Sequence, residues 1–213
     1  MKHFVITILD NPKSVESAER CIASAKYFGL DVQKHPAYTP ADNLDKLLQE
    51  NQIPAQRFVE RFSRTENCIA AFMSHHSLWK KCVELNEEVT IFEHDAYVVN
   101  EISDNLQYYS CINLGAPSYG KYMTPSLGVG MLTSKKYFPG AHAYRLKPMG
   151  AQALLNVAPI EACPTDLYLH SERFPFLEEY YPWPVEARDT FTTIQTTAGC
   201  LAKHNWGSNY EIL

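Results

Sequence analysis

The residue types best suited to chemistry stand directly after a short apolar segment, Val89–Phe92, where the sequence reads Glu93-His94-Asp95. In open α/β sheets, ligands bind beyond the carboxyl ends of the strands. If the strand continues through this triplet, alternation puts Glu93 and Asp95 on one face and His94 on the other, with the acidic Cα atoms roughly 6.5–7 Å apart. Two converging carboxylates suit a hard divalent cation, Mn²⁺ or Mg²⁺, that also holds a diphosphate. The competing interpretation is a solvated strand end.

The elements that must position this triplet are predicted by two kinds of periodicity. Near-continuous apolar runs indicate buried strands, and apolar residues at steps of three and four indicate amphipathic helices. Strands are expected at residues 4–9, 31–35, 89–92, 111–114 and 191–194. Helices are expected at residues 12–28, 43–50, 65–86 and 148–156. This order predicts an α/β fold: one domain over residues 1–213, with a central, mostly parallel mixed sheet flanked by helices.

Two stretches give weaker signals of regular structure. Residues 115–130 are rich in glycine and proline but lack the GxGxxG and GxxxxGK[ST] patterns, so dinucleotide and P-loop sites are not expected. Residues 159–184 are rich in aromatic residues and proline, which predicts irregular structure. These aromatic side chains would either stack on a bound ligand or cover the sheet.

Composition excludes several classes of protein. The formal net charge is −5, which argues against a nucleic-acid partner. The longest apolar run, Cys68–Met73, has six residues, whereas a transmembrane helix needs about 20. The six cysteines form no CxxC pair, and no zinc-type spacing joins them to the eight histidines. We therefore expect a reduced, cytoplasmic protein without a transmembrane segment.

One helical segment resembles a signature of glycosyltransferase family 25, which includes lipopolysaccharide-type and collagen galactosyltransferases. The family helix carries a Glu, a Cys, a Ser-His pair and a Trp, which here are Glu66, Cys68, Ser74-His75 and Trp79. The family strand that follows ends in Glu-Asp-Asp, where this chain has Glu93-His94-Asp95. Later family segments resemble Asn113-Leu114-Gly115, Gly140, Ala143-Tyr144, Gly150-Ala151 and Pro164-Thr165-Asp166. The resemblance covers roughly residues 60 to 170.

This resemblance implies a single GT-A-like, Rossmann-like domain and a metal-dependent hexosyltransferase of lipopolysaccharide or glycan biosynthesis. Such an enzyme moves a hexose, which in this family is usually galactose, from a UDP-sugar to a hydroxyl group of a glycan, a lipid-linked acceptor or another acceptor. The reaction inverts the configuration at the anomeric carbon. A lipid-linked acceptor would make the cytoplasmic protein peripheral at the membrane. A divalent cation, Mn²⁺ or Mg²⁺, would neutralise the charge on the leaving UDP, and a carboxylate would take the proton of the acceptor hydroxyl.

The resemblance also implies a role for particular residues. The expected metal ligands are Glu93, Asp95 and, near the C-terminus, His204, for which a surface position is the alternative. The expected base is Asp166, although an Asp after Pro-Thr is also an ordinary helix cap. Separately from the resemblance, Arg64 just before the signature helix could reach a donor phosphate, as the helix N-terminus itself could, and a solvated charge is the alternative. The full donor-binding set is Ser74, His75 and Arg64.

Two positions depart from the family pattern, since His94 replaces the middle acid of the triplet and Asn67 replaces the glycine before the cysteine. Three outcomes follow for His94: it faces away from a metal held by the outer acids, it binds the metal itself, or activity has been lost. The main alternative function is therefore a non-catalytic sugar-nucleotide or glycan-binding module on the same fold. A glycoside hydrolase that uses a carboxylate pair, Glu93 with Asp166, is a third hypothesis.

Overall fold

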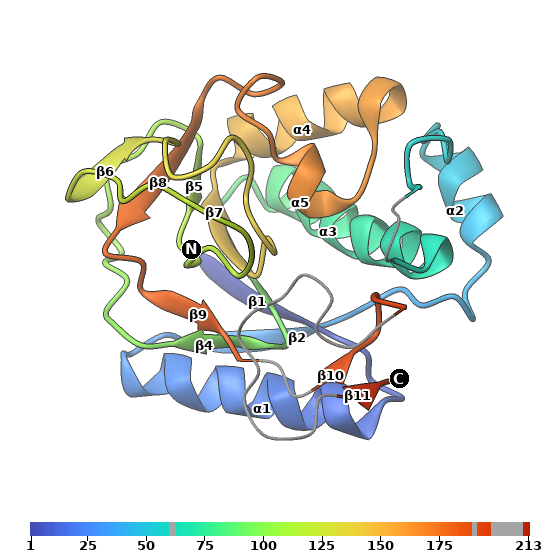
Figure 1. The fold of residues 1–213 in the computed structure, drawn as a ribbon, viewed down its shortest axis with the longest axis horizontal. Helices are drawn as coiled ribbons and strands as arrows, with labels where there is room; N and C mark the ends of the chain where they lie inside the picture. The colour runs from blue at the N-terminus through green and yellow to red at the C-terminus, as the bar shows by residue number, and fades with distance from the viewer. Residues whose placement is uncertain (60–62, 189–190, 197–210) are drawn as a thin grey trace.

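A seven-stranded mixed sheet forms the centre of the computed structural model, which describes residues 1–59, 63–188, 191–196 and 211–213 (Figure 1). The strand order is β2-β1-β3-β7-β5-β8-β6. The strands span Lys2–Thr7 (β1), Val32–Pro36 (β2), Val89–Glu93 (β3), Cys111–Asn113 (β5), Gly128–Met131 (β6), Ala143–Leu146 (β7) and Leu177–Tyr181 (β8).

The direction of the strands follows from their pairings. Three pairings are parallel (β1–β2, β1–β3 and β5–β8) and three are antiparallel (β3–β7, β5–β7 and β6–β8). The predicted α/β class, with a mixed sheet and flanking helices, is confirmed. A mostly parallel sheet is not confirmed, because half of the pairings in the described sheet are antiparallel. Since β7 runs against both of its neighbours, β3 and β5 still point in the same direction.

Helices lie on both faces of this sheet (Figure 1). The helix on one face is α1 (Pro12–Tyr27), and the long helices on the other are α3 (Thr65–Leu85) and α4 (Pro148–Glu161). Two shorter helices complete the set, α2 (Leu44–Glu50) and α5 (Thr165–Tyr168). Within the described residues, none of the helices has both the length and the apolar character needed to cross a membrane.

The buried side chains form two clusters, one on each face of the sheet. In β1, Phe4 and Ile6 belong to the cluster that contains α3, whereas Val5 belongs to the cluster that contains α1. The same alternation occurs in β3, where Ile91 faces α3 and Phe92 faces α1. Both faces of these strands are therefore buried, which explains their near-continuous apolar sequence.

Local signals set the ends of the helices. The side chain of Asn11 accepts hydrogen bonds from the backbone N–H groups of Lys13 (3.0 Å) and Ser14 (3.2 Å), so it caps α1 at the predicted start. Gly29 follows α1 with φ +82°, the left-handed conformation that glycine adopts without strain. Asn86 ends α3 in the same region, with φ 51°. These helix boundaries agree with the prediction to within one or two residues.

Several expectations for the second half of the chain were wrong. In the main sheet, three strands lie where no strand was expected, namely β6, β7 and β8. Residues 159–184, expected to be irregular, contain the end of α4, all of α5 and all of β8, whereas the strand expected at residues 191–194 is only Phe191–Thr192 (β10). The strands that were missed have four or five residues, and their backbone is held by neighbours distant in sequence rather than by local propensity.

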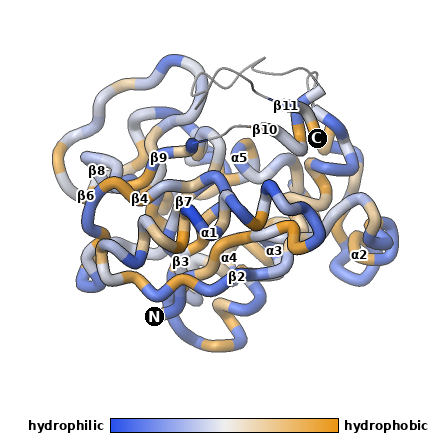
Figure 2. The backbone as a smooth tube through the Cα atoms, turned by 90° about the horizontal axis from the view of Figure 1, so that it is seen from below, coloured by the Kyte–Doolittle hydropathy of each residue, from blue (hydrophilic) through white to orange (hydrophobic). Residues whose placement is uncertain are grey.

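Two small strand pairs stand apart from the main sheet. One joins β4 (Ala96–Val98) to β9 (Val185–Ala187), and the other joins β10 to β11 (Glu211–Ile212). Figure 2 shows β10, β11 and the C-terminus at the edge of the molecule opposite the N-terminus. Because β1 runs away from the N-terminus, this is the edge toward which the carboxyl ends of β1 and β3 point.

Candidate active site

A pocket of about 500 Å³ opens beyond the carboxyl end of β3. It brings together three acidic residues that the sequence proposed as functional, Glu93, Asp95 and Asp166. Its lining also includes His94, Tyr119, Lys135, Tyr137 and His142. Residues from four distant parts of the chain therefore meet at one end of the sheet.

The strand alternation assumed for the acidic triplet stops at its first residue. β3 ends at Glu93, and the next two residues form a turn that leads into β4. His94 lines the same pocket as Glu93 and Asp95. Its ring contacts Ser14 of α1, whereas Glu93 contacts His75 of α3, so these two side chains lie toward opposite faces of the sheet. A turn has no two-residue repeat, so the argument from strand geometry does not extend beyond Glu93.

His94 is held in the wall of the pocket by two contacts. Its Nδ1 lies 3.1 Å from Ser14 Oγ, in the first turn of α1, and its ring stacks on Phe191 with the ring centroids 5.3 Å apart. Because Ser14 Oγ already accepts the N–H of Ile8 (2.9 Å), its proton is available for Nδ1. Burial lowers the pKa of His94, and the charge of Asp95 opposes this shift. We infer that the imidazole is neutral.

Glu93 is contacted by His75 of the signature helix. His75 Nε2 lies 3.0 Å from Glu93 Oε1, and His75 Nδ1 lies 2.9 Å from the hydroxyl of Tyr144 in β7. The same hydroxyl accepts a hydrogen bond from Trp79 Nε1 at 2.8 Å. Burial lowers the pKa of His75 to about 3, so its contact with Glu93 is a hydrogen bond from a neutral ring rather than an ion pair.

Asp166 lies in the short helix α5, which is distant from the triplet in sequence but lines the same pocket. Its carboxylate accepts hydrogen bonds from the backbone N–H of Leu167 (2.9 Å) and from the hydroxyl of Tyr119. Burial raises the pKa of Asp166, although these hydrogen bonds oppose the shift. The residue at the N-cap of α5 is Pro164, so Asp166 is not the N-cap residue of this helix.

Lys135 brings a positive charge to the pocket. Its ammonium group lies 5.0 Å from the ring centroid of Tyr119 and 4.9 Å from that of Tyr137, and it donates a hydrogen bond to the Tyr137 hydroxyl at 3.1 Å. Cation–π contacts of this kind fix an ammonium group between aromatic faces. Lys135 therefore sits next to the Tyr119–Asp166 pair, at a position that the sequence analysis did not single out.

His142 is a second pocket residue that the sequence analysis missed. Its backbone carbonyl accepts the N–H of Glu93 at 2.9 Å, which places the two residues side by side at the end of the β3–β7 pair. Its ring lies between two glycines: a Cβ on Gly115 would stand 2.5 Å from Nε2, and one on Gly140 would stand 3.2 Å from Nδ1. Both glycines lie in segments that resemble the family. Their lack of a side chain was the sequence signal that a bulky neighbour, here the His142 ring, occupies this space.

The three residues proposed for donor binding have different positions. Ser74 and His75 line a smaller pocket of about 80 Å³, together with Tyr38 and Thr39 after β2. Ser74 Oγ accepts the N–H of Tyr38 (2.9 Å) and donates to the carbonyl of Ala70 (2.8 Å), so it ties α3 to the segment after β2. Arg64 caps α3 through its backbone and, within the part of the chain that the structure describes, lines neither the large pocket nor the smaller one. His204 lies outside the described residues.

The pocket fits one mode of metal binding better than another. Among the described residues, no three side chains of His, Cys, Asp or Glu are grouped so that they could enclose a metal ion. Glu93 and Asp95 nevertheless line one pocket, and Mg²⁺-type cations are commonly held by one or two carboxylates together with the phosphates of a substrate. The donor set therefore fits a cation that arrives with a diphosphate rather than a preformed metal cage.

An acidic pocket at the carboxyl ends of an α/β sheet is the arrangement expected of an enzyme or binding protein for a charged small molecule. The model of glycosyltransferase family 25 (LPS biosynthesis protein) matches residues 25–118. The matched residues include β3, the triplet and all of α3, and the match supports the family predicted from the sequence. This match supports a glycosyltransferase. A search of curated proteins gave no match.

Proposed function

We propose that this protein transfers a hexose, galactose by family habit, from a UDP-sugar to a hydroxyl of a glycan or lipid-linked acceptor, with inversion at the anomeric carbon. The observation that carries the proposal is the meeting of Glu93, Asp95 and Asp166 in one pocket beyond β3. The family match to residues 25–118 supports the class of reaction. A pocket of about 500 Å³ is large enough for a sugar and part of its acceptor.

The donor nucleotide is proposed to lie beyond the carboxyl ends of β1 and β2. The smaller pocket there is lined by Ile8, Tyr38 and Thr39, and it shares Glu93 and His94 with the large pocket. A nucleoside placed over the strand ends would therefore direct its diphosphate toward Glu93 and its sugar into the large pocket. Ligands of open α/β sheets bind at this edge for the same topological reason.

Glu93 and Asp95 are proposed to hold Mn²⁺ or Mg²⁺ together with the donor diphosphate. The bound cation supplies charge neutralisation for the departing UDP. His204 is proposed as a further ligand on its sequence position alone. The chain's own part is to present two carboxylates in the large pocket, with Glu93 also lining the smaller pocket and fixed by the neutral imidazole of His75 at 3.0 Å.

Asp166 is proposed to take the proton of the acceptor hydroxyl as that oxygen attacks the anomeric carbon and the bond to UDP breaks. Burial raises the pKa of Asp166, which increases the affinity of the carboxylate for a proton. The Tyr119 hydroxyl donates a hydrogen bond that orients the carboxylate. Asp166 thus has the fixed geometry and the proton affinity that a general base requires.

Thermal unfolding with UDP, with Mn²⁺ and with both, against ADP and GDP, tests the donor site. A ligand at 100 times its Kd stabilises the fold by about 2.7 kcal/mol, which raises the midpoint of a protein this size by roughly 5–10 °C. We expect a shift that needs UDP and Mn²⁺ together and that Asp95→Ala abolishes. A shift with UDP alone would argue against metal dependence, and no shift with any nucleotide would overturn the proposal.

A second function, a non-catalytic module that binds a sugar nucleotide or glycan, is favoured by one observation. His94, in place of the family's acid, is packed against Phe191 and bonded to Ser14 inside the pocket wall. Replacement by the family residue, His94→Asp, distinguishes the two functions. A binding module stays inert toward UDP-galactose after the change, whereas a transferase retains turnover and changes its preference between Mn²⁺ and Mg²⁺.

A further inference from the structure

We propose that His75 is a positioning residue that fixes the carboxylate of Glu93 through a one-way chain of hydrogen bonds, running from Trp79 to Tyr144, to His75 and to Glu93. The three contacts measure 2.8, 2.9 and 3.0 Å. The role of Glu93 at the donor rests on the proposed function. The chain of hydrogen bonds itself rests only on the geometry of these four residues.

The direction of the chain follows from which groups can donate. An ionised carboxylate only accepts hydrogen bonds, so His75 Nε2 must carry a proton and donate it to Glu93. In a neutral ring Nδ1 is then an acceptor, and the Tyr144 hydroxyl donates to it. The hydroxyl accepts in turn from Trp79, whose indole N–H is only a donor. Each of the three contacts thus has one donor and one acceptor. The buried Trp79 and Tyr144 therefore fix the tautomer of His75.

The chain leads from the core to the pocket. Trp79 and Tyr144 are fully buried, whereas 27 % of the Glu93 side chain is exposed. The His75 ring is nearly parallel to that of Tyr144, with the ring centroids 5.8 Å apart, and this packing restricts rotation of the imidazole. Tyr144 pairs with Ile91 across the β3–β7 ladder, and Glu93 lies two residues beyond Ile91 on the same strand. The series of hydrogen bonds is therefore held by two elements, with Trp79 and His75 in helix α3 and Tyr144 in strand β7.

The next residue of α3 offers a matched control. His76 is also buried, with 5 % of its surface exposed, and its ring lies against Phe72 and Trp79. It does not line either pocket that contains Glu93 in the described structure. His76→Gln therefore removes a buried imidazole from the same helix without removing the contact to Glu93.

The tautomer of His75 can be measured without any ligand. In ¹⁵N-labelled protein at pH 7, we expect the Nε2–H form of His75, and we expect Tyr144→Phe to shift the Nδ1 signal because its donor is lost. The carboxyl ¹³C signal of Glu93 should move in His75→Leu and not in His76→Gln. An Nδ1–H form in the unaltered protein, or a Glu93 signal indifferent to His75→Leu, would overturn the proposal.

Binding of Mn²⁺ in the presence of UDP, measured by calorimetry, tests what the positioning achieves. Loss of a group that orients a ligating side chain typically weakens metal affinity by about 10–100-fold. We expect His75→Leu to fall in that range, His75→Gln to recover part of it through its amide N–H, and His76→Gln to leave affinity unchanged. Equal losses in His75→Leu and His76→Gln would contradict positioning. If the unaltered protein binds neither UDP nor Mn²⁺, the proposed function fails, and the carboxyl signal alone decides the role of His75.

Discussion

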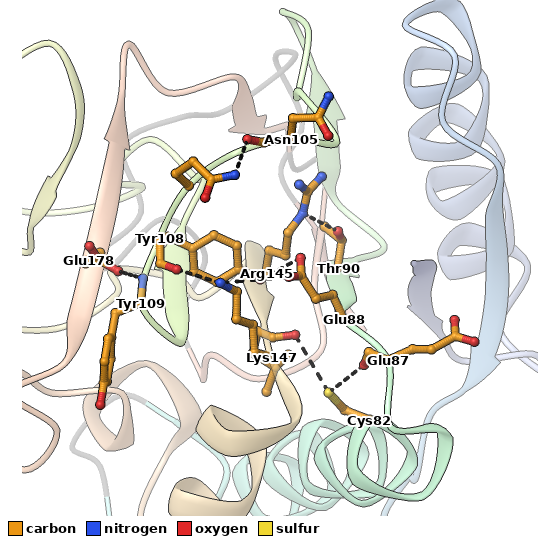
Figure 3. Close-up of polar contacts among 12 residues, drawn as sticks. Cys82, Glu87, Glu88, Thr90, Asn105, Tyr108, Tyr109, Arg145, Lys147 and Glu178 are labelled. Carbon is orange, nitrogen blue, oxygen red and sulfur yellow. Dashed lines mark hydrogen bonds and ion pairs between the residues drawn. The ribbon is translucent and has the colours of Figure 1, made fainter.

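The two ends of the β3–β7 pair differ in how their buried polar groups are satisfied. At the end near the N-terminus of β3, Arg145 donates to Thr90 Oγ1 at 3.0 Å (Figure 3). It also donates to the carbonyl of Ser103 at 2.8 Å. In the same cluster, Lys147 donates to the carbonyl of Tyr108 (2.7 Å), whose hydroxyl donates to Glu88 (3.1 Å). These charged groups bond to other protein groups, although Nη2 of Arg145 is buried without a hydrogen-bond partner among the described residues.

At the carboxyl end, the hydrogen bonds run from the core to a pocket. Trp79, Tyr144 and His75 lie in series behind Glu93, which faces the pocket with Asp95. The comparison suggests that polar groups at the first end stabilise the fold, whereas those at the second end prepare a carboxylate for a ligand. The following predictions test this difference, from the largest expected effect to the smallest.

Asp166→Asn should cause the largest loss of transfer. A positioned general base contributes about 10²–10⁴-fold to rate, and the amide cannot take up the acceptor proton. Nucleotide-dependent stabilisation should persist, because Asp166 is proposed to act on the acceptor. The measurement is the initial rate with UDP-galactose and a panel of sugar acceptors, with the exposed Glu172→Gln as control. Full activity of Asp166→Asn would remove Asp166 from the mechanism.

Arg145→Met should destabilise the fold without changing the binding site. The side chain is fully buried, and each hydrogen bond from a charged group contributes about 1.5–3 kcal/mol. We expect a total loss of about 2–4 kcal/mol, which lowers the melting midpoint by roughly 5–15 °C. The control is Arg57→Met, since that guanidinium is largely exposed beside Glu161. A lower affinity for UDP at a temperature where Arg145→Met is still folded would contradict the comparison of the two ends.

Gly115→Ala should damage the carboxyl end specifically. The added Cβ would stand 2.5 Å from His142 Nε2, so the ring must move within the pocket wall. Overpacking of this kind costs about 1–3 kcal/mol, and the displaced ring should also weaken UDP binding. Gly130→Ala is the matched control, because a Cβ there meets no heavy atom within 4 Å. Circular-dichroism melts and UDP titrations of both variants should separate the two effects.

The smallest effect concerns acid stability. Burial lowers the pKa of His75 to about 3 and that of His76 to about 4, against about 6.5 in an unfolded chain. The unfolded state therefore binds more protons below about pH 6.5, and stability should fall as the pH drops from about 6.5 to about 4. His75→Gln and His76→Gln should each reduce this dependence in urea titrations at several pH values. Only His75→Gln should also affect Mn²⁺ binding.

Much of the first half of the fold could be predicted because its signals are local. The cap at Asn11, the apolar stripe of α3 and the strand before Glu93 depend on neighbours within a few residues. The second half could not be predicted in the same way. β7 is only four residues long, and its backbone is held by β3 and β5, which are distant in sequence.

The same division applies to the site. The sequence by itself determined the acidic triplet, the Ser-His helix, the candidate base and the family, because these are residue types at fixed spacing along the chain. Only the tertiary structure decided that His94 lines the pocket, that His142 fills the space beside Gly115, and that Tyr144 joins Trp79 to His75. The physical reason is that strand pairing and side-chain packing are set by contacts between distant segments, for which local periodicity carries no signal.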